Sequence, residues 1–167
     1  ACNRDAWRQV LRWPDWPDKS LLIVGEEQSG KTHLARVWAE TFDAHWVAGV
    51  DFASAATPEL LLDTHPLLVV DDCERADPTA LFHLLNAVKG RGQTGLLLTV
   101  NPRSCWQHFT LPDLRSRLQS LPQVVLGPPD DEMLAALLVK QFQDKQIQVG
   151  EGLIPYLVPR MERSWLA

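Results

Sequence analysis

Apolar runs alternate with segments of helical periodicity along most of the chain. Residues 21–24 and 67–70 are continuously apolar, which is typical of strands covered on both faces. Between them, residues 31–42 repeat their apolar positions at helical spacing and predict a helix. Further strands are expected at residues 45–50, 96–100 and 123–126, and further helices at 57–62, after an Asp77 cap with Pro78 at the first helical position, and at 111–118. This alternation predicts an α/β fold with a parallel sheet flanked by helices.

The pattern changes after Pro129. From Asp130 onward only helical periodicity remains, and Pro159 can open a further helix. We therefore expect an α/β core over residues 1–129 and a small α-helical lid domain over 130–167. The sequence has no initiator Met and stops within a helical pattern, so we expect a longer protein whose lid continues.

Residues 25–32 fit the phosphate-binding pattern G-x-x-x-x-G-K-[ST] between an expected strand and an expected helix. In this context, backbone N–H groups at a helix N-terminus cradle phosphate oxygens, Lys31 reaches the terminal phosphates, and the Thr32 hydroxyl binds Mg²⁺. The loop predicts binding of ATP or ADP. Its candidate nucleotide-binding residues are Gly25, Gln28, Ser29, Gly30, Lys31, Thr32 and His33.

Polar residues follow two of the expected strands. Asp71 and Asp72 end the strand at 67–70, and Asn101 ends the strand at 96–100. The carboxyl ends of parallel strands share one edge of a sheet, which is where a nucleotide and its metal bind. We assign Asp71 to Mg²⁺ together with Thr32, Asp72 to orienting the attacking water, and Asn101 to the γ-phosphate or that water.

Two pairs of arginines are candidates for contacts with phosphate. Arg115 and Arg117 lie in the expected helix at 111–118, where a guanidinium could stabilise phosphoryl charge across a subunit boundary. Arg160 and Arg163 lie in the lid and could report the state of the nucleotide. The spacing of these arginines does not show which member of each pair contacts phosphate.

The start of the chain predicts a short helix capped by Asn3 and ended by prolines. Trp13 and Trp16 lie among these prolines, and either could border the nucleotide base.

Composition narrows the class of protein. The formal net charge is -5 and no long run of Lys or Arg occurs, so direct DNA binding is not expected. No apolar stretch has the length of a membrane span, no secretory signal is evident, and the three cysteines lack metal-ligand spacing. These features predict a cytoplasmic protein with reduced thiols.

Four segments together resemble the AAA+ module of the bacterial DnaA/Hda family. They are Gly-Lys-Thr-His-Leu at 30–34, Val-Val-Asp-Asp at 69–72, Leu-Leu-Thr-Val-Asn at 97–101 and Leu-Pro-Asp-Leu-Arg-Ser-Arg-Leu at 111–118. The resemblance implies an AAA+ core followed by a helical lid. It also implies that Arg117 is the finger that contacts nucleotide on a neighbouring subunit, that Asn101 is the first sensor and that Arg160 or Arg163 is the second. Asn3 and its helix are similar to the segment that packs near the adenine.

The same resemblance suggests partners. An Hda-like regulator would act on the DnaA initiator and promote hydrolysis of the initiator's ATP. Weak ATPase activity of the regulator itself stays open, as does a homo-oligomer. Members of this kind bind the DNA polymerase sliding clamp through an N-terminal sequence that the residues printed here do not contain. Two alternatives stay open at this point: the AAA+ module of a DNA-binding DnaA-type initiator, and a transposition or helicase-loading ATPase.

Overall fold

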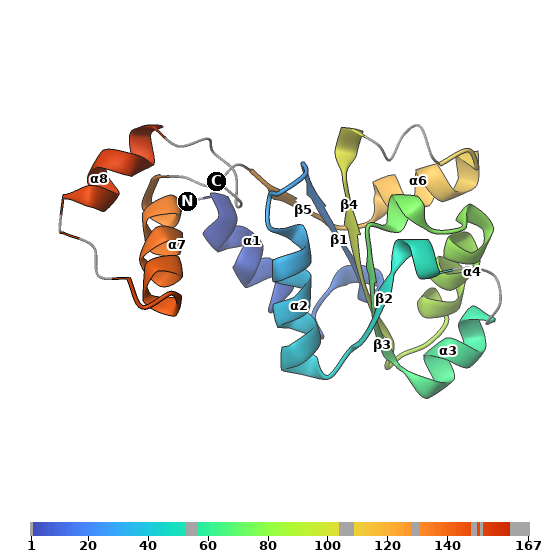
Figure 1. Cartoon of the computed structure of the whole chain (residues 1–167). Coiled ribbons are helices and arrows are strands. Elements are labelled where there is room, and N and C mark those ends of the chain that lie inside the picture. The colour runs from blue at the N-terminus through green and yellow to red at the C-terminus, as the bar shows by residue number, and fades with distance from the viewer. Residues whose placement is uncertain are drawn as a thin grey trace.

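The computed structural model describes residues 2–52, 57–103, 109–127, 131–147, 150 and 152–160. Its centre is a five-stranded sheet in the order β2-β3-β4-β1-β5, and every neighbouring pair of strands is parallel (Figure 1). The strands are β1 Ser20–Gly25, β2 His45–Ala48, β3 Leu67–Asp71, β4 Gly95–Val100 and β5 Gln123–Leu126. The expected parallel α/β fold is confirmed.

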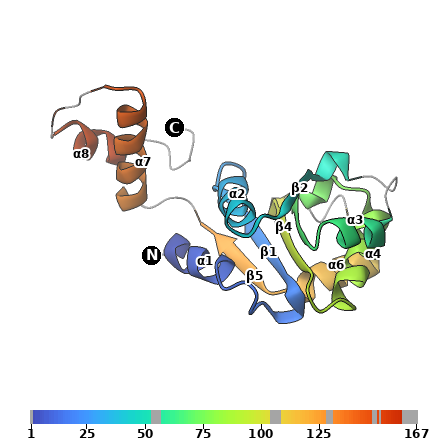
Figure 2. The same cartoon turned by 90° about the horizontal axis from the view of Figure 1, so that it is seen from below.

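Helices cover both faces of this sheet (Figures 1 and 2). α1 and α2 lie on one face, and α3, α4 and α6 lie on the other. The helices of the core are α1 Cys2–Val10, α2 Lys31–Phe42, α3 Pro58–Thr64, α4 Pro78–Lys89 and α6 Pro112–Ser120. This two-sided cover explains why the central strands read as continuous apolar runs rather than as alternating patterns.

Successive residues of the central strands enter different cores, because side chains alternate across a sheet. On β3, Leu68 and Val70 pack towards α4, whereas Val69 between them packs towards α2. Leu96 and Leu97 on β4 divide in the same way. The strands are therefore fixed in register by two cores, which positions their carboxyl ends accurately.

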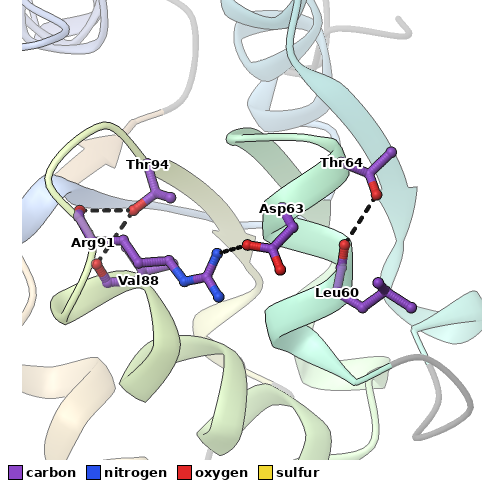
Figure 3. A network of polar contacts seen from close by, with 6 residues as sticks. All are labelled: Leu60, Asp63, Thr64, Val88, Arg91 and Thr94. Carbon is purple, nitrogen blue, oxygen red and sulfur yellow. Dashed lines mark hydrogen bonds and ion pairs between the residues drawn. The ribbon is translucent and has the colours of Figure 1, made fainter.

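The helix α4 begins as the sequence predicts. The Asp77 carboxylate accepts a 2.8 Å hydrogen bond from the N–H of Ala80, and Pro78 occupies the first turn. Beyond its last residue, the Thr94 hydroxyl donates to the Val88 and Arg91 carbonyls, and Arg91 forms an ion pair with Asp63 of α3 (Figure 3). These contacts hold the connection that leads into β4.

Two expectations about the bounds of elements are corrected. Asn3 is not a cap, because α1 begins at Cys2 and the Asn3 side chain instead donates to the Gly127 carbonyl over 3.5 Å. The strand expected at 45–50 ends at Ala48, since a 3₁₀ turn, Gly49–Asp51, follows. A Cβ on Gly49 would lie 2.2 Å from the Asp72 carbonyl oxygen, so a close backbone approach sets this end.

Trp13 and Trp16 do not border the Gly25–Thr32 loop. Trp16 stacks on Trp38 of α2 with 5.0 Å between ring centroids, and the Trp13 ring packs against Gly95, the first residue of β4. The loop lies after the last residue of β1, and β1 runs parallel to β4. The two indoles are therefore at the amino end of the sheet, opposite the loop.

Residues beyond the sheet form a separate helical cluster. It comprises α7 Asp131–Asp144, α8 Leu153–Leu157 and a 3₁₀ turn, Val158–Arg160, with Leu134, Leu138 and Val158 buried at its centre. Figure 1 shows these helices lying apart from the sheet, on the side of α1. The division at residue 129 stays a prediction. In the described part of the chain, none of the helices combines the length and the apolarity that crossing a bilayer requires.

Candidate nucleotide site

The loop between β1 and α2 is a tight turn built on two glycines. Gly30 adopts a φ of 90° at the N-terminus of α2, and Gln28 also lies in the left-handed region, with a φ of 60°. A Cβ on Gly25 would lie 2.2 Å from the Ser29 hydroxyl, and Ser29 is buried. Ser29 thus packs closely against Gly25, and the loop ends at a helix N-terminus, whose backbone N–H groups suit phosphate oxygens.

Lys31 is held towards this loop. The residue is buried, with 6% of its surface exposed, and its Nζ donates a 2.8 Å hydrogen bond to the Glu26 carbonyl. An ammonium group has further N–H donors, which remain for an anion at the mouth of the loop. Burial of a lysine without a facing carboxylate is costly, so an incoming phosphate would relieve that cost.

Thr32 and Asp71 are in direct contact across 39 positions of sequence. The Thr32 hydroxyl lies 3.2 Å from Asp71 Oδ1 and 3.0 Å from Oδ2. From β4, the Thr99 hydroxyl donates to Asp71 Oδ1 over 2.6 Å and accepts from the Asp72 N–H over 2.8 Å. Asp72 itself has a φ of 52°, so its backbone is held in a conformation that non-glycine residues seldom adopt.

A second set of contacts joins the end of β4 to the phosphate loop. Buried Glu74 accepts a 3.0 Å hydrogen bond from the Asn101 N–H, and the Asn101 side-chain oxygen accepts one from the Arg103 N–H. The Arg103 guanidinium then pairs with Glu26 of the loop at 2.8 Å. The Asn101 segment is therefore tied both to the turn after β3 and to the loop after β1.

These elements enclose a cleft of about 450 Å³ at the carboxyl edge of the sheet. It is lined by Glu27, Gln28, Lys31, Thr32, Asp72, Glu74, Arg75 and Asn101. The structure thus brings together Gln28, Lys31 and Thr32 of the predicted loop, the second aspartate and the predicted sensor asparagine. Open α/β sheets bind their ligands at this edge.

The residues present fit a magnesium nucleotide. A hydroxyl and a carboxylate in contact, Thr32 and Asp71, are the hard oxygen donors that Mg²⁺ prefers. Within the described ranges no group of three or more His, Cys, Asp or Glu side chains is arranged to hold a metal. This agrees with the ordinary behaviour of Mg²⁺, which takes few protein ligands and completes its shell with water and phosphate oxygens.

The predicted arginines that the structure describes lie outside the cleft lining. The Arg117 guanidinium lies over the Phe82 ring of α4 at 5.3 Å and is half-buried, whereas Arg115 is exposed. Arg160 lies over the Tyr156 ring at 4.0 Å and donates to the Tyr156 carbonyl, within the helical cluster of α7 and α8. Arg163 lies outside the described residues.

Two further candidates are placed at the periphery. Asn3 ties the start of α1 to the chain that follows β5, through the Gly127 carbonyl. His33 is exposed on the first turn of α2, one residue beyond Thr32. Neither lines the cleft formed by the described residues, so their nucleotide-binding roles stay predictions.

Sequence reasoning missed three residues of the site: Thr99, Glu74 and Arg75. Thr99 has a signal, because it is a hydroxyl within an otherwise apolar strand and such a group needs a buried partner. Glu74 and Arg75 belong to a 3₁₀ turn, Cys73–Arg75, directly after the aspartate pair. Nothing in their spacing distinguishes them from residues of a solvated turn.

Comparisons with known proteins agree with this fold. No family model matches the chain. An uncharacterized protein of Haemophilus influenzae is 26% identical over 154 residues, covering 85% of this chain and 66% of that protein. The chromosomal replication initiator protein DnaA of Symbiobacterium thermophilum is 25% identical, covering 97% of this chain and 41% of the initiator. This chain thus spans about two thirds of the length of the first relative and less than half of the second.

Among solved structures, AMPPCP-bound DnaA from Aquifex aeolicus superposes with a TM-score of 0.77. It shares 16% sequence identity and is matched over 97% of this chain and 58% of its own. The α/β P-loop fold expected from the sequence is therefore confirmed, and the fold is similar to that of this DnaA.

Proposed function

We propose that this chain is an Hda-like AAA+ regulator of replication initiation. It binds ATP or ADP with Mg²⁺ in its own cleft, and it promotes hydrolysis of the ATP held by the initiator DnaA. The observation that carries the nucleotide half of this proposal is the contact of Thr32 with Asp71 beside buried Lys31, at the mouth of a glycine turn.

In the cleft, each residue of the chain has a distinct task. Backbone N–H groups from Gln28 to Thr32 and the Lys31 ammonium bind phosphate oxygens. Thr32 and Asp71 would hold Mg²⁺, which neutralises phosphate charge when bound. Asp72, fixed by Thr99, orients a water near the terminal phosphate, and Asn101, which lines the same cleft, contacts that phosphate or the water.

The regulatory half of the proposal uses Arg117 in a neighbouring site. Arg117 lies outside its own cleft, on α6, and the Phe82 ring supports its guanidinium. A guanidinium held in place by packing loses less freedom when it docks against phosphate, so it stabilises transferred charge more effectively. ATP is then hydrolysed in the partner's site, so this chain needs little ATPase activity of its own.

The remaining assignments belong to the same proposal. Arg160 or Arg163 acts as second sensor, Asn3 packs near the adenine, and residues 130–167 form the lid over the nucleotide. The similarity to DnaA supports action within the DnaA system. A cytoplasmic bacterial location, sliding-clamp binding by a segment outside this sequence, and a homo-oligomer are further parts of the proposal.

Calorimetric titration tests the nucleotide half. The wild type is titrated with ADP and with ATP in the presence of Mg²⁺, and Lys31→Ala should abolish binding because it removes the buried cation at the loop. Unchanged affinity in Lys31→Ala would contradict the proposed site.

Phosphate release from ATP-loaded DnaA tests the regulatory half. Wild type should accelerate release, Arg117→Ala should lose that acceleration because it removes the guanidinium supported by the Phe82 ring, and Arg115→Ala should keep most of it. Nucleotide binding without any effect on DnaA would leave the cleft intact and remove the regulatory role.

A second function is favoured by the similarity to an initiator. The chain is 25% identical to a DnaA initiator over 97% of its own residues, so an initiator module is a direct alternative. A transposition or helicase-loading ATPase is a further one. Affinity for DNA that falls steeply with salt would favour either of these over the regulator.

A further inference from the structure

The turn directly after the aspartate pair carries an arginine into the nucleotide cleft. Arg75 ends the 3₁₀ turn Cys73–Arg75, and its N–H donates a 2.9 Å hydrogen bond to the Asp72 carbonyl. Cys73 and Glu74 in the same turn are buried, whereas the Arg75 side chain is exposed and lines the cleft. The backbone beneath this guanidinium is thus anchored to Asp72 and to the core.

The Arg75 guanidinium has no hydrogen bond or ion pair with the residues that the structure describes, although Glu27, Asp72 and Glu74 line the same cleft. Arg103 provides the contrast, because its guanidinium is paired with Glu26. A cation at the wall of a cleft and not engaged by its acids can be taken up by an anion that enters.

The lining of the cleft has more acidic than basic side chains, so a cation is needed to bind a highly charged anion. Lys31 and Arg75 are the cations in its described lining, against the carboxylates of Glu27, Asp72 and Glu74. Each added phosphate group increases the repulsion with these acids. Arg75 also belongs to the turn that begins at Asp72, and the residue before it, Glu74, accepts the Asn101 N–H. Its backbone therefore lies beside the two residues that are assigned to the terminal phosphate and the attacking water.

We propose that Arg75 contacts the terminal phosphate of ATP bound in the same chain and thereby sets the preference for ATP over ADP. The planar guanidinium can donate to two phosphate oxygens at once, which a lysine cannot reproduce. Arg75 is in this sense a specificity-determining residue. The inference rests on the proposed nucleotide site and assigns it a discriminating group.

The test compares the dissociation constants of ATP and ADP, with Mg²⁺, for wild type and Arg75→Gln. We expect Arg75→Gln to weaken ATP binding about tenfold, the loss of one charge-assisted contact, and to change ADP binding less than about twofold. The ATP affinity of Arg75→Lys should lie between those of the wild type and Arg75→Gln. Arg91→Gln is the matched control, since its guanidinium is paired with Asp63 outside the cleft lining, and it should leave the ratio of the two constants unchanged. Arg103→Gln examines the neighbouring guanidinium, which is paired with Glu26 of the loop.

Several outcomes would overturn the inference. Equal weakening of ATP and ADP by Arg75→Gln would show a general charge effect, and unchanged constants would show that Arg75 faces a partner chain or solvent. Loss of nucleotide preference in Arg103→Gln alone would transfer the role to Arg103. A wild type that binds neither nucleotide would overturn the proposed site together with this inference, which distinguishes that failure from the others.

Discussion

Thr99 and Asp71 are joined by a 2.6 Å hydrogen bond in which the fully buried hydroxyl of β4 donates to Oδ1 of the carboxylate that ends β3. The same hydroxyl accepts the backbone N–H of Asp72. One side chain therefore orients the carboxylate that contacts Thr32 and fixes the unusual backbone of the next residue. The Thr99 hydroxyl thus links the two acidic residues, through the side chain of Asp71 and the backbone of Asp72.

Thr99→Val should weaken both the fold and the site. The variant keeps the shape but leaves the Asp72 N–H and Asp71 Oδ1 without this partner, at a cost of about 1–3 kcal/mol in the free energy of unfolding. Urea denaturation measures that cost, and titration with ATP at varied Mg²⁺ measures the expected rise in the Mg²⁺ requirement. Thr99→Ser retains the hydroxyl and should stay close to wild type. Equal behaviour of the two variants would contradict this account of Thr99.

Gly25→Ala should impair nucleotide binding through packing alone. The new Cβ would meet the Ser29 hydroxyl at 2.2 Å and the Leu126 Cβ at 3.2 Å, so the loop must shift. Overpacking of this kind costs about 1–3 kcal/mol. Gly92→Ala is the control, because nothing lies within 4 Å of its Cβ. Thermal melting and ATP titration should separate the two variants, and a Gly25→Ala protein that binds ATP like the control would show that the loop adapts.

The elements that the sequence predicts best are those with strong local signals. The helix at 31–42 and the strand at 123–126 were predicted with the bounds that the structure shows. The α4 cap at Asp77 was also confirmed. Each depends on residues adjacent in sequence, such as a glycine or proline at the boundary, so local chemistry decides the outcome.

The features that escaped prediction depend on contacts between distant segments. The end of β2 is set by the approach of Gly49 to the Asp72 carbonyl, and the placement of Trp13 is set by Gly95. Arg75 and Glu74 reach the cleft because the turn after β3 folds back towards Asn101. Neither spacing nor periodicity carries this information. The roles of Arg117, Arg160 and Asn3 stay predictions.

Phe82→Leu should reduce the action of Arg117 on a partner's nucleotide without unfolding the protein. The Phe82 ring faces the Arg117 guanidinium at 5.3 Å and is only partly buried against the core, so leucine retains most of the packing. Such a cation–π contact is worth about 0.5–1 kcal/mol at exposed sites, which corresponds to a few-fold loss of stimulated phosphate release. Phe82→Tyr keeps an aromatic face and should restore the rate. If both variants stimulate DnaA like wild type, Phe82 does not position Arg117.

Stability should fall as the solution becomes acidic, through a pair of stacked histidines. The centroid of the His45 ring on β2 lies 4.0 Å from the centroid of the His65 ring, with 10° between the ring planes. Burial, and secondarily the charge of His65, lower the pKa of His45 from its ordinary value of 6.5. Between the lowered pKa and about 6.5, the unfolded chain binds more protons than the folded one, so the free energy of unfolding rises with pH through this window. This contribution is complete above the unfolded pKa and is lost as pH falls through the folded one.

His45→Gln should therefore flatten the dependence of the denaturation midpoint on pH below about 6.5. His65→Gln should flatten it less, because it removes the neighbouring charge but leaves most of the burial of His45. His83→Gln, an exposed position on α4, serves as the control and should leave the slope as in wild type. Denaturation series at several pH values measure all three slopes. A His45→Gln protein with the wild-type slope would mean that other groups govern the acid sensitivity of this fold.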